Sequence, residues 1–140
     1  GLRAPRSIRE AGDAPIIEPT TDDSFGVDLC AAVRREVDAV GSGSVAVICP
    51  TSWVDRVERS LVSGGVDFGQ AHRGRFDHQV TVAPVRLVKG LELDACIVLD
   101  PQVILDEEHR GAQTLYVALT RATKRLSILH TLALPDVLRT

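Results

Sequence analysis

Hydrophobic and polar residues follow two different periods along this chain. Short continuous apolar runs occupy residues 44–49 and 95–99, and residues 80–83 and 126–130 are further strand-like stretches that include polar residues such as Thr81 and Ser127. Such runs are typical of parallel strands that are covered on both faces. Between them, apolar residues recur at steps of three and four, which is the period of an amphipathic helix. Strands that alternate with helices at short intervals predict an α/β fold, in which one parallel sheet has helices on both of its faces.

The helical spacing of apolar residues predicts three helices. Their expected ranges are residues 27–40, residues 54–61 and a last helix from about Gly111 through Arg125. Glycines follow the first two helices directly or within a few residues, as at many helix ends. On a helical wheel, the last helix turns Leu115 toward the sheet and gathers its basic residues on the opposite side, namely Arg121, Lys124 and Arg125.

Other stretches give weaker signals. Residues 16–17 and 66–68 are predicted as short strands, whereas residues 103–108 fit more than one kind of structure. Residues 70–79 are polar and turn-like. Residues 1–15 contain two prolines and show no apolar period, so we expect a linker there, followed by a single domain at residues 16–140.

Composition indicates a globular protein. The 140 residues are 44% hydrophobic and 25% charged, which suffices for one hydrophobic core. No apolar run approaches the roughly 20 residues that span a bilayer, and the N-terminus lacks the layout of a signal peptide, so we expect a cytoplasmic protein without membrane contact. The net charge of −3 differs from that of autonomous nucleic-acid-binding domains. Any nucleic-acid contact should therefore be local or shared with another domain.

Cysteine and histidine residues do not suggest a metal site. Cys30, Cys49 and Cys96 lie far apart among apolar neighbours, and the four histidines are equally scattered. We expect buried thiols and no bound metal.

Candidate chemistry gathers around the apolar run at residues 95–99. The segment Lys89-Gly90-Leu91-Glu92-Leu93 precedes this run, and Leu115-Tyr116-Val117-Ala118-Leu119-Thr120-Arg121-Ala122 follows it. In open α/β sheets, ligands bind where strands end. Together the two segments resemble motifs V and VI of UvrD/Rep-type superfamily 1 helicases, K-G-L-E-F and L-Y-V-A-x-T-R-A. The resemblance covers about residues 44–129 and implies a RecA-like domain, the second of the two in a helicase motor.

The resemblance implies roles in ATP hydrolysis. Arg121 corresponds to the motif VI arginine that reaches the γ-phosphate of ATP across the cleft between the motor domains, because a guanidinium stays charged and donates paired hydrogen bonds. Glu92 corresponds to a glutamate that accepts hydrogen bonds from the nucleotide sugar. Gly90 would let the backbone approach the nucleotide, and Lys89 would bond to backbone or phosphate. Supporting positions are Tyr116, Thr120 and Arg125. The alternative for Arg121 is an exposed helix arginine that pairs with an acid such as Glu107 or Glu108.

Nucleic-acid contacts are matched less well. UvrD-type helicases have a histidine and a small hydroxyl residue before K-G-L-E, where this chain has Arg86 and Leu87. Leu93 replaces the usual phenylalanine. Arg73 and Arg75 lie in a basic loop with one aromatic residue, which fits either a nucleic-acid backbone or a solvated loop. The ATP-side pattern is therefore retained, while the DNA-side pattern is not.

A variant branch fits better. HelD-like proteins, relatives of UvrD that act on bacterial RNA polymerase, are similar to this chain in residues 6–12, in Val88-Lys89-Gly90-Leu91-Glu92 followed by a strand that ends at Asp100-Pro101, and in the last motif. This branch would add RNA polymerase to the expected partners, which are DNA and an N-terminal RecA-like domain of the same parent.

No phosphate-binding loop of the form G-x-x-x-x-G-K-[ST] occurs in the chain. ATP with Mg²⁺ is therefore expected in a full-length parent, and we expect this chain alone to hold no nucleotide and to lack ATPase activity. The competing function is a non-catalytic docking module of a HelD-like ATPase. A small Rossmann-like enzyme is disfavoured, because no glycine-rich turn follows the first strand.

Overall fold

The computed structural model describes residues 14–139. Within these residues one sheet has six strands in the order β1-β6-β5-β2-β4-β3, and every neighbouring pair is parallel. The strands are β1 (Ile16–Pro19), β2 (Val45–Cys49), β3 (Gly69–Gln70), β4 (Val80–Pro84), β5 (Leu93–Leu99) and β6 (Ala122–His130). The predicted parallel sheet is confirmed.

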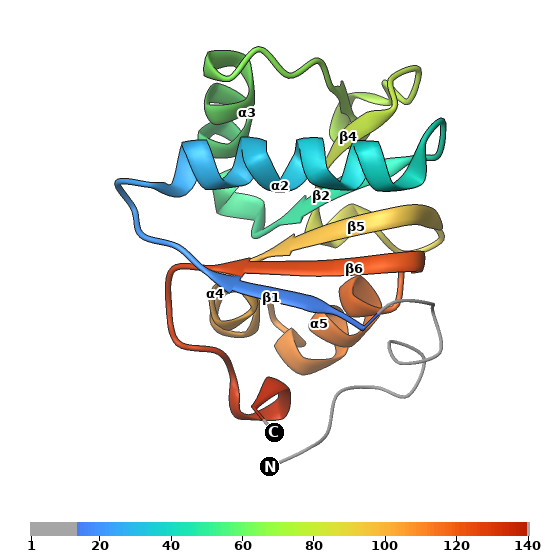
Figure 1. The fold of residues 1–140 in the computed structure, drawn as a ribbon. Coiled ribbons are helices and arrows are strands. Elements are labelled where there is room, and N and C mark those ends of the chain that lie inside the picture. The colour runs from blue at the N-terminus through green and yellow to red at the C-terminus, as the bar shows by residue number, and fades with distance from the viewer. Residues whose placement is uncertain (1–13, 140) are drawn as a thin grey trace.

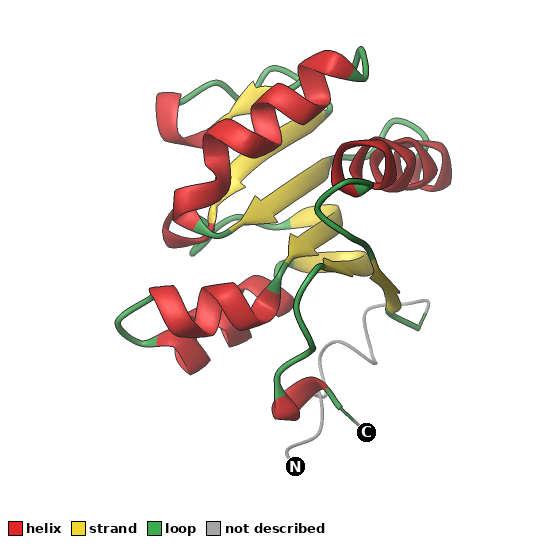
Figure 2. Ribbon diagram, turned by 90° about the vertical axis from the view of Figure 1, so that its left-hand side faces the viewer, coloured by secondary structure: helices red, strands yellow, loops and turns green. Residues whose placement is uncertain are grey.

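Helices cover both faces of the sheet (Figures 1 and 2). One face carries α2 (Phe25–Val40), which crosses in front of the strands in Figure 1, and α3 (Val54–Ser63), whereas α4 (Pro101–Glu107) and α5 (Gly111–Leu119) pack on the other face. Short 3-10 helices occur in the connections: η1 (Thr51–Trp53), η2 (Ala71–Arg73), η3 (Val85–Leu87) and η4 (Asp136–Leu138).

Two apolar clusters form the core, one on each side of the sheet. Residues of β2 divide between them, because Val45, Val47 and Cys49 face α2 and α3, whereas Ala46 and Ile48 face α4 and α5. All five are fully buried. A strand that is buried on both faces has no position for a polar residue, which explains the continuous apolar runs in the sequence.

Parallel strands give the sheet two different edges. We term the edge where strands begin the amino edge, and the edge where they end the carboxyl edge. Residues 85–92, which we term the crossover, lead from the end of β4 to the start of β5 and so return from the carboxyl edge to the amino edge. Val85 and Val88 are buried in the cluster beneath α4 and α5. The crossover therefore runs across that face of the sheet.

The last helix is shorter than predicted. α5 ends two residues before Arg121, which lies in the turn to β6, and Lys124 and Arg125 lie on β6 itself. The hydroxyl of Thr120 donates to carbonyls of the last helical turn. Pairing of β6 with β5 outweighs the helical propensity of the residues that follow. The prediction that these basic residues project from the side of a helix is wrong.

Three other elements differ from expectation. The strand predicted at residues 66–68 is wrong, since β3 follows that stretch instead. The undecided stretch at residues 103–108 belongs mainly to α4, which begins at Pro101, where a missing N–H needs no partner. α2 starts two residues earlier than predicted, and Val27, expected on its apolar face, is 75% exposed.

The linker predicted at residues 1–15, with its HelD-like stretch at residues 6–12, falls almost entirely outside the described residues. Within residues 14–139 no helix is long and apolar enough to cross a membrane, and no group of three or more His, Cys, Asp or Glu side chains could hold a metal ion. The three cysteines are buried and unpaired, as predicted. Burial raises the pKa of Cys49 and Cys96 to about 12.

Candidate functional site

The two sequence motifs meet at the amino edge. The backbone N–H of Leu93 donates to the carbonyl of Arg121 at 3.2 Å, and a guanidinium N–H of Arg121 donates to the carbonyl of Leu91 at 3.4 Å. Residues 89–92 of the crossover therefore lie beside the turn between α5 and β6. Each motif leads into a strand rather than out of one. The expectation that these residues lie where strands end is therefore wrong, since they lie where β5 and β6 begin.

Arg121 is half-buried, and neutral acceptors fix its guanidinium. Its Nε donates to the carbonyl of Val117 at 3.0 Å, and a second terminal nitrogen donates to the hydroxyl of Thr120 at 3.3 Å. No carboxylate among residues 14–139 pairs with Arg121. The alternative of a pair with Glu107 or Glu108 is therefore wrong. The positive charge is oriented but uncompensated within the described part of the chain.

Gly90 forms the turn that brings the crossover to this edge. Its φ of +88° is a left-handed conformation that favours glycine, and the N–H of Leu91 closes the turn on the carbonyl of Val88 at 3.0 Å. An added Cβ would meet nothing within 4 Å. The glycine is needed for backbone conformation rather than for space around it.

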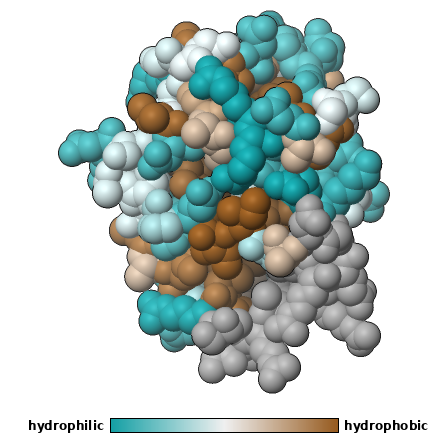
Figure 3. All heavy atoms as spheres, in the orientation of Figure 1, coloured by the Kyte–Doolittle hydropathy of each residue, from teal (hydrophilic) through white to brown (hydrophobic). Residues whose placement is uncertain are grey.

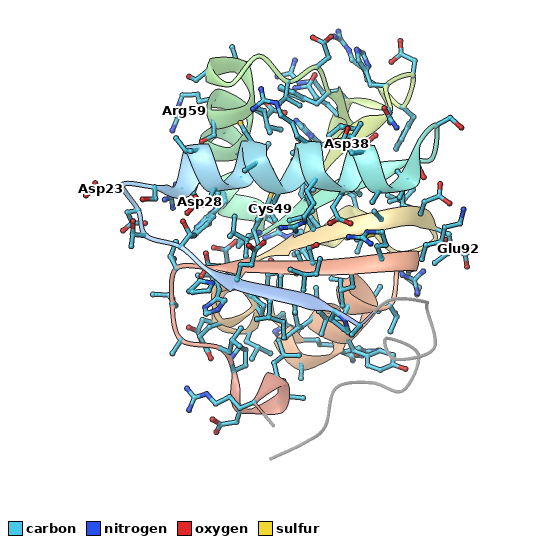
Figure 4. The ribbon with its side chains drawn as sticks, viewed as in Figure 1. Asp23, Asp28, Asp38, Cys49, Arg59 and Glu92 are labelled. Carbon is cyan, nitrogen blue, oxygen red and sulfur yellow. The ribbon has the colours of Figure 1, made fainter. Side chains whose placement is uncertain are left out.

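Exposed charges flank this turn. Lys89 and Glu92 make no hydrogen bond or ion pair with residues 14–139, and Figure 4 shows Glu92 projecting beyond the start of β5. Asp94 differs, because it accepts the backbone N–H of Ser44 at 2.8 Å and lies 3.3 Å from Nζ of Lys124, contacts that lower the pKa of Asp94. At the amino edge, the carboxylate of Glu92 and the ammonium of Lys89 are therefore exposed and unpaired within residues 14–139.

Of the three predicted supporting residues, only Thr120 contacts the guanidinium of Arg121. Its hydroxyl also donates to the carbonyls of Tyr116 and Val117, at 3.1 and 3.0 Å, which fixes the hydroxyl oxygen as an acceptor. The side chain of Tyr116 is 52% exposed and lines a separate hollow of about 500 Å³ between α5 and the C-terminal residues 134–139. Tyr116 is therefore not brought to the site.

Arg125 points to the opposite face of the sheet. It donates to Glu36 of α2 at 2.7 Å, and Arg35 donates to the same carboxylate at 2.9 Å. Burial alone raises the pKa of Glu36, but hydrogen bonds from Arg125 and Arg35 oppose this, and the net pKa lies below its ordinary value. Arg125 is thus part of a buried ion pair that joins β6 to α2, and it is not brought to the site.

Glu36 is fully buried, and its role was not predicted from the sequence. Its only signal is position, since it follows Leu29 and Val33 at helical spacing on the buried face of α2. A carboxylate on such a face requires a cation in the interior. The sequence offers several cations, however, and spacing alone does not choose among them.

At the carboxyl edge, hydrogen-bond donors that could bind a phosphate already donate to carboxylates of the same chain. Ser52 donates its backbone N–H to Glu107 at 3.0 Å and its hydroxyl to the same carboxylate. Glu108 accepts from the hydroxyl of Thr51 at 3.5 Å and lies 3.4 Å from Nε of Arg86. The charge of Arg86, the residue predicted to face nucleic acid, is therefore compensated within the chain.

A hollow of about 390 Å³ lies between the crossover and α5. Three cations line it, Arg86, Lys89 and Arg110, together with one carboxylate, Glu108. It extends from Arg86 toward Val117, whose carbonyl accepts a hydrogen bond from Arg121.

The structure does not bring Arg73 and Arg75 to the motifs. Both are exposed and lie at or just after η2, next to the edge strand β3. Arg121 precedes β6, and three strands lie between β6 and β3 in the sheet. Any nucleic-acid contact made by this loop would be separate from the amino-edge site.

Comparison with known proteins identifies the family. Residues 46–130 match the family described as the viral superfamily 1 RNA helicase core domain. No curated protein matches the chain. Among solved structures, the C-terminal domain of a possible DNA helicase from Lactobacillus plantarum WCFS1 is 23% identical and has a TM-score of 0.75, with 98% of this chain and 91% of that chain covered.

Two more distant structures have a similar fold. The SWI2/SNF2 ATPase core of Sulfolobus solfataricus, in complex with dsDNA, is 15% identical with a TM-score of 0.57, and the match covers 81% of this chain and 27% of that one. The arterivirus nonstructural protein 10 helicase, in complex with DNA, is 15% identical with a TM-score of 0.54, covering 90% and 30%. These likenesses support a RecA-like α/β fold. Because the family match spans more than half of the sequence, this chain belongs to the superfamily 1 helicases, in the family of the viral superfamily 1 RNA helicase core domain.

Proposed function

We propose that this chain is the C-terminal motor domain of an ATP-dependent DNA helicase or translocase. In this proposal, Arg121 acts on the γ-phosphate of ATP that is bound by an N-terminal RecA-like domain of the same parent. The observation that carries the proposal is the oriented, uncompensated guanidinium of Arg121 beside the exposed Glu92 at one edge of the sheet. The helicase family supports it.

The hydrogen bonds of Arg121 leave it suited to a phosphate. A guanidinium has five N–H groups, and the neutral acceptors take one on Nε and one on each terminal nitrogen. One N–H therefore remains on each terminal nitrogen. Such a pair matches two oxygens of one phosphoryl group. Because the anchoring acceptors are neutral, the full charge of Arg121 is available to stabilise charge that develops during phosphoryl transfer.

The residues around Gly90 fit other parts of the nucleotide. Glu92 would accept hydrogen bonds from ribose hydroxyls, and Lys89 would lie near phosphate, since both are exposed and have no partner among residues 14–139. ATP with Mg²⁺ would supply the phosphoryl group, and the absent phosphate-binding loop assigns its binding to the other motor domain. This chain would then complete the site rather than form it.

A docking role is the second candidate. Glu107 and Glu108 occupy the donors of the carboxyl edge, including Arg86, which leaves fewer groups there for a DNA strand. In that case ATP would set the orientation of the domain, and binding of a protein partner would be the main activity. A HelD-like parent would make RNA polymerase that partner.

Replacing Arg121 in the full-length parent tests the proposal. We expect Arg121→Ala to lower ATP turnover by about a thousandfold, because an arginine finger contributes at least that much to the rate. Arg121→Lys should recover little of it, since lysine keeps the charge but loses the paired donors. Arg139→Ala, which removes an exposed arginine of the C-terminal residues, serves as the control and should leave turnover unchanged. Normal turnover of the Arg121 variants would favour the docking role.

A further inference from the structure

A second cationic feature lies on the other face of the sheet, between α2 and α3, and takes no part in the proposed function. It is an open groove of about 620 Å³ whose rim carries Arg34 from α2 and both Arg56 and Arg59 from α3. We term it the arginine groove. One carboxylate, Asp23, lies at its end, and small or apolar residues line the rest: Gly26, Val27, Cys30, Ser60, Ser63 and Gly64.

The floor of the arginine groove is accessible and partly apolar. The helices touch beneath it, because a Cβ added to Gly64 would lie 2.3 Å from Sγ of Cys30. Above this contact Val27 is 75% exposed, although its neighbours on α2 belong to the core. Figure 3 shows apolar atoms among hydrophilic ones in the upper half of this face, where α2 and α3 lie. The groove therefore offers an apolar contact between charged walls.

Two of the three arginines are held in place. Arg56 pairs with Asp22 at 2.9 Å and stacks over the rings of Phe25 and Trp53, 4.3 and 4.4 Å from their centroids. Arg34 donates to a carbonyl at the end of α3. Guanidinium groups that are already ordered lose little conformational entropy when an anion binds.

The third arginine has no partner in the described part of the chain. Arg59 is exposed and makes no hydrogen bond or ion pair with residues 14–139, and Figure 4 shows it extending from α3 away from the sheet. A fixed Arg34 and an unpaired Arg59 thus border one exposed apolar side chain. Eight residues of helix separate Gly26 from Arg34, which is about 12 Å, room for three or four residues of an extended peptide.

We infer that the arginine groove binds a short acidic segment of a partner protein. One apolar side chain of the segment would rest on Val27, and carboxylates on either side of it would pair with Arg34 and Arg59. Nucleic acid fits less well, because the exposed carboxylate of Asp23 at one end of the groove would repel a continuing chain of phosphates. A peptide carries its charge locally and can turn away there.

Fluorescence anisotropy with a labelled peptide, Asp-Glu-Asp-Leu-Leu-Glu-Asp-Glu, tests this inference on the chain as it stands. We expect saturable binding that weakens with salt. Arg59→Gln should weaken it about tenfold, as expected for loss of one hydrogen bond between charged groups. Val27→Asp should weaken it at least as much by placing a carboxylate on the floor. Both side chains are exposed, so neither variant disturbs the core.

Arg139→Gln is the matched control, because it removes the same charge from an exposed arginine remote from the groove. It should leave the affinity within about twofold of the original, a change near the limit of surface electrostatic effects. The inference is overturned if the peptide does not bind at about 1 mM, the weak end of specific association. The inference is also overturned if the Arg59→Gln and Val27→Asp variants bind the peptide as tightly as the original chain does. The same holds if a peptide with Asn and Gln in place of Asp and Glu binds as tightly as the acidic peptide, or if an equimolar oligothymidylate of the same length displaces the acidic peptide.

Discussion

Arg121 and Arg125 are four residues apart in the sequence, yet they lie in opposite electrostatic environments. Arg125 faces α2, where it shares the buried carboxylate of Glu36 with a second arginine. Arg121 faces the amino edge, where it meets two carbonyls and a hydroxyl and no described carboxylate. The charge of Arg125 is therefore compensated within the domain. The guanidinium of Arg121 is held in one orientation, but its charge has no described counter-ion and is available to another molecule.

This contrast separates arginines that hold the domain together from arginines that act outside it. Removing one partner of a buried ion pair strongly destabilises the folded chain, because the other charge stays buried without a partner. Neutral acceptors around a half-exposed guanidinium add little stability but set its direction. Substitution of Arg125 should therefore mainly reduce stability, and substitution of Arg121 should mainly reduce ATP turnover.

The largest effect on stability should come from Arg125. We expect Arg125→Met to reduce the free energy of unfolding by about 3 kcal/mol, because Glu36 would remain buried with Arg35 as its one remaining cation among the described residues and with an incomplete set of hydrogen bonds. Arg121→Met should cost about 1 kcal/mol or less, the net value of hydrogen bonds to neutral groups. Urea unfolding of this chain, followed by circular dichroism, measures both. Equal losses at the two positions would remove the distinction drawn here.

Acid should weaken the same ion pair. The folded-state pKa of Glu36 lies below its ordinary value of 4.5, because the hydrogen bonds from two arginines outweigh the effect of burial. The unfolded chain therefore binds a proton first as the pH falls. The contribution of Glu36 to stability is fully present above pH 4.5 and is lost as the pH falls from 4.5 through the lower folded-state pKa.

Urea midpoints between pH 7 and pH 3 measure this dependence. Glu36→Gln should flatten the profile in the acid range relative to the original chain, since the substituted amide does not titrate. An unchanged profile would place the acid sensitivity in other carboxylates.

Much of the fold could be predicted from the sequence, because burial on both faces forces continuous apolar runs on the central strands. β2 illustrates this, with five consecutive buried residues. The end of α5 could not be predicted in this way. Its sequence continues with helix-forming residues after Thr120, and only pairing with the distant strand β5 turns them into β6. Local propensity carries no information about that partner.

Parts of the candidate site could also be predicted from the sequence, and other parts could not. The motif resemblance groups Arg121 with residues 89–92, and in the structure they lie side by side because both adjoin the start of neighbouring strands. It could not predict the different fates of Arg121 and Arg125, since the helical wheel placed both on one side. Arg121 instead lies in the turn before β6, and an irregularity in the pairing of β6 with β5, between Ala122 and Arg125, places Arg125 on the face of α2. Nor could it predict that Glu108 compensates Arg86, which depends on the fold of α4.

The smallest effect should come from Gly90, and it sharpens the comparison because Gly41 offers a matched control. Both glycines have positive φ, +88° and +63°, and an added Cβ would meet nothing within 4 Å at either position. Ala at each should therefore reduce the free energy of unfolding of this chain by about 1 kcal/mol or more through backbone strain alone. The loss should be at least as large at Gly41 as at Gly90, because the ψ of −109° at Gly41 lies outside the left-handed helical region, and urea unfolding measures both.

Turnover in the full-length parent should separate them. Gly90 sets the position of Leu91, whose carbonyl holds Arg121, so Gly90→Ala should lower ATP turnover by about tenfold through a small displacement of the guanidinium. Gly41 ends α2 and has no contact with the motifs, so Gly41→Ala should leave turnover unchanged. If both variants lose turnover equally, general loosening of the domain explains the result, and the turn at Gly90 has no separate role in aiming Arg121.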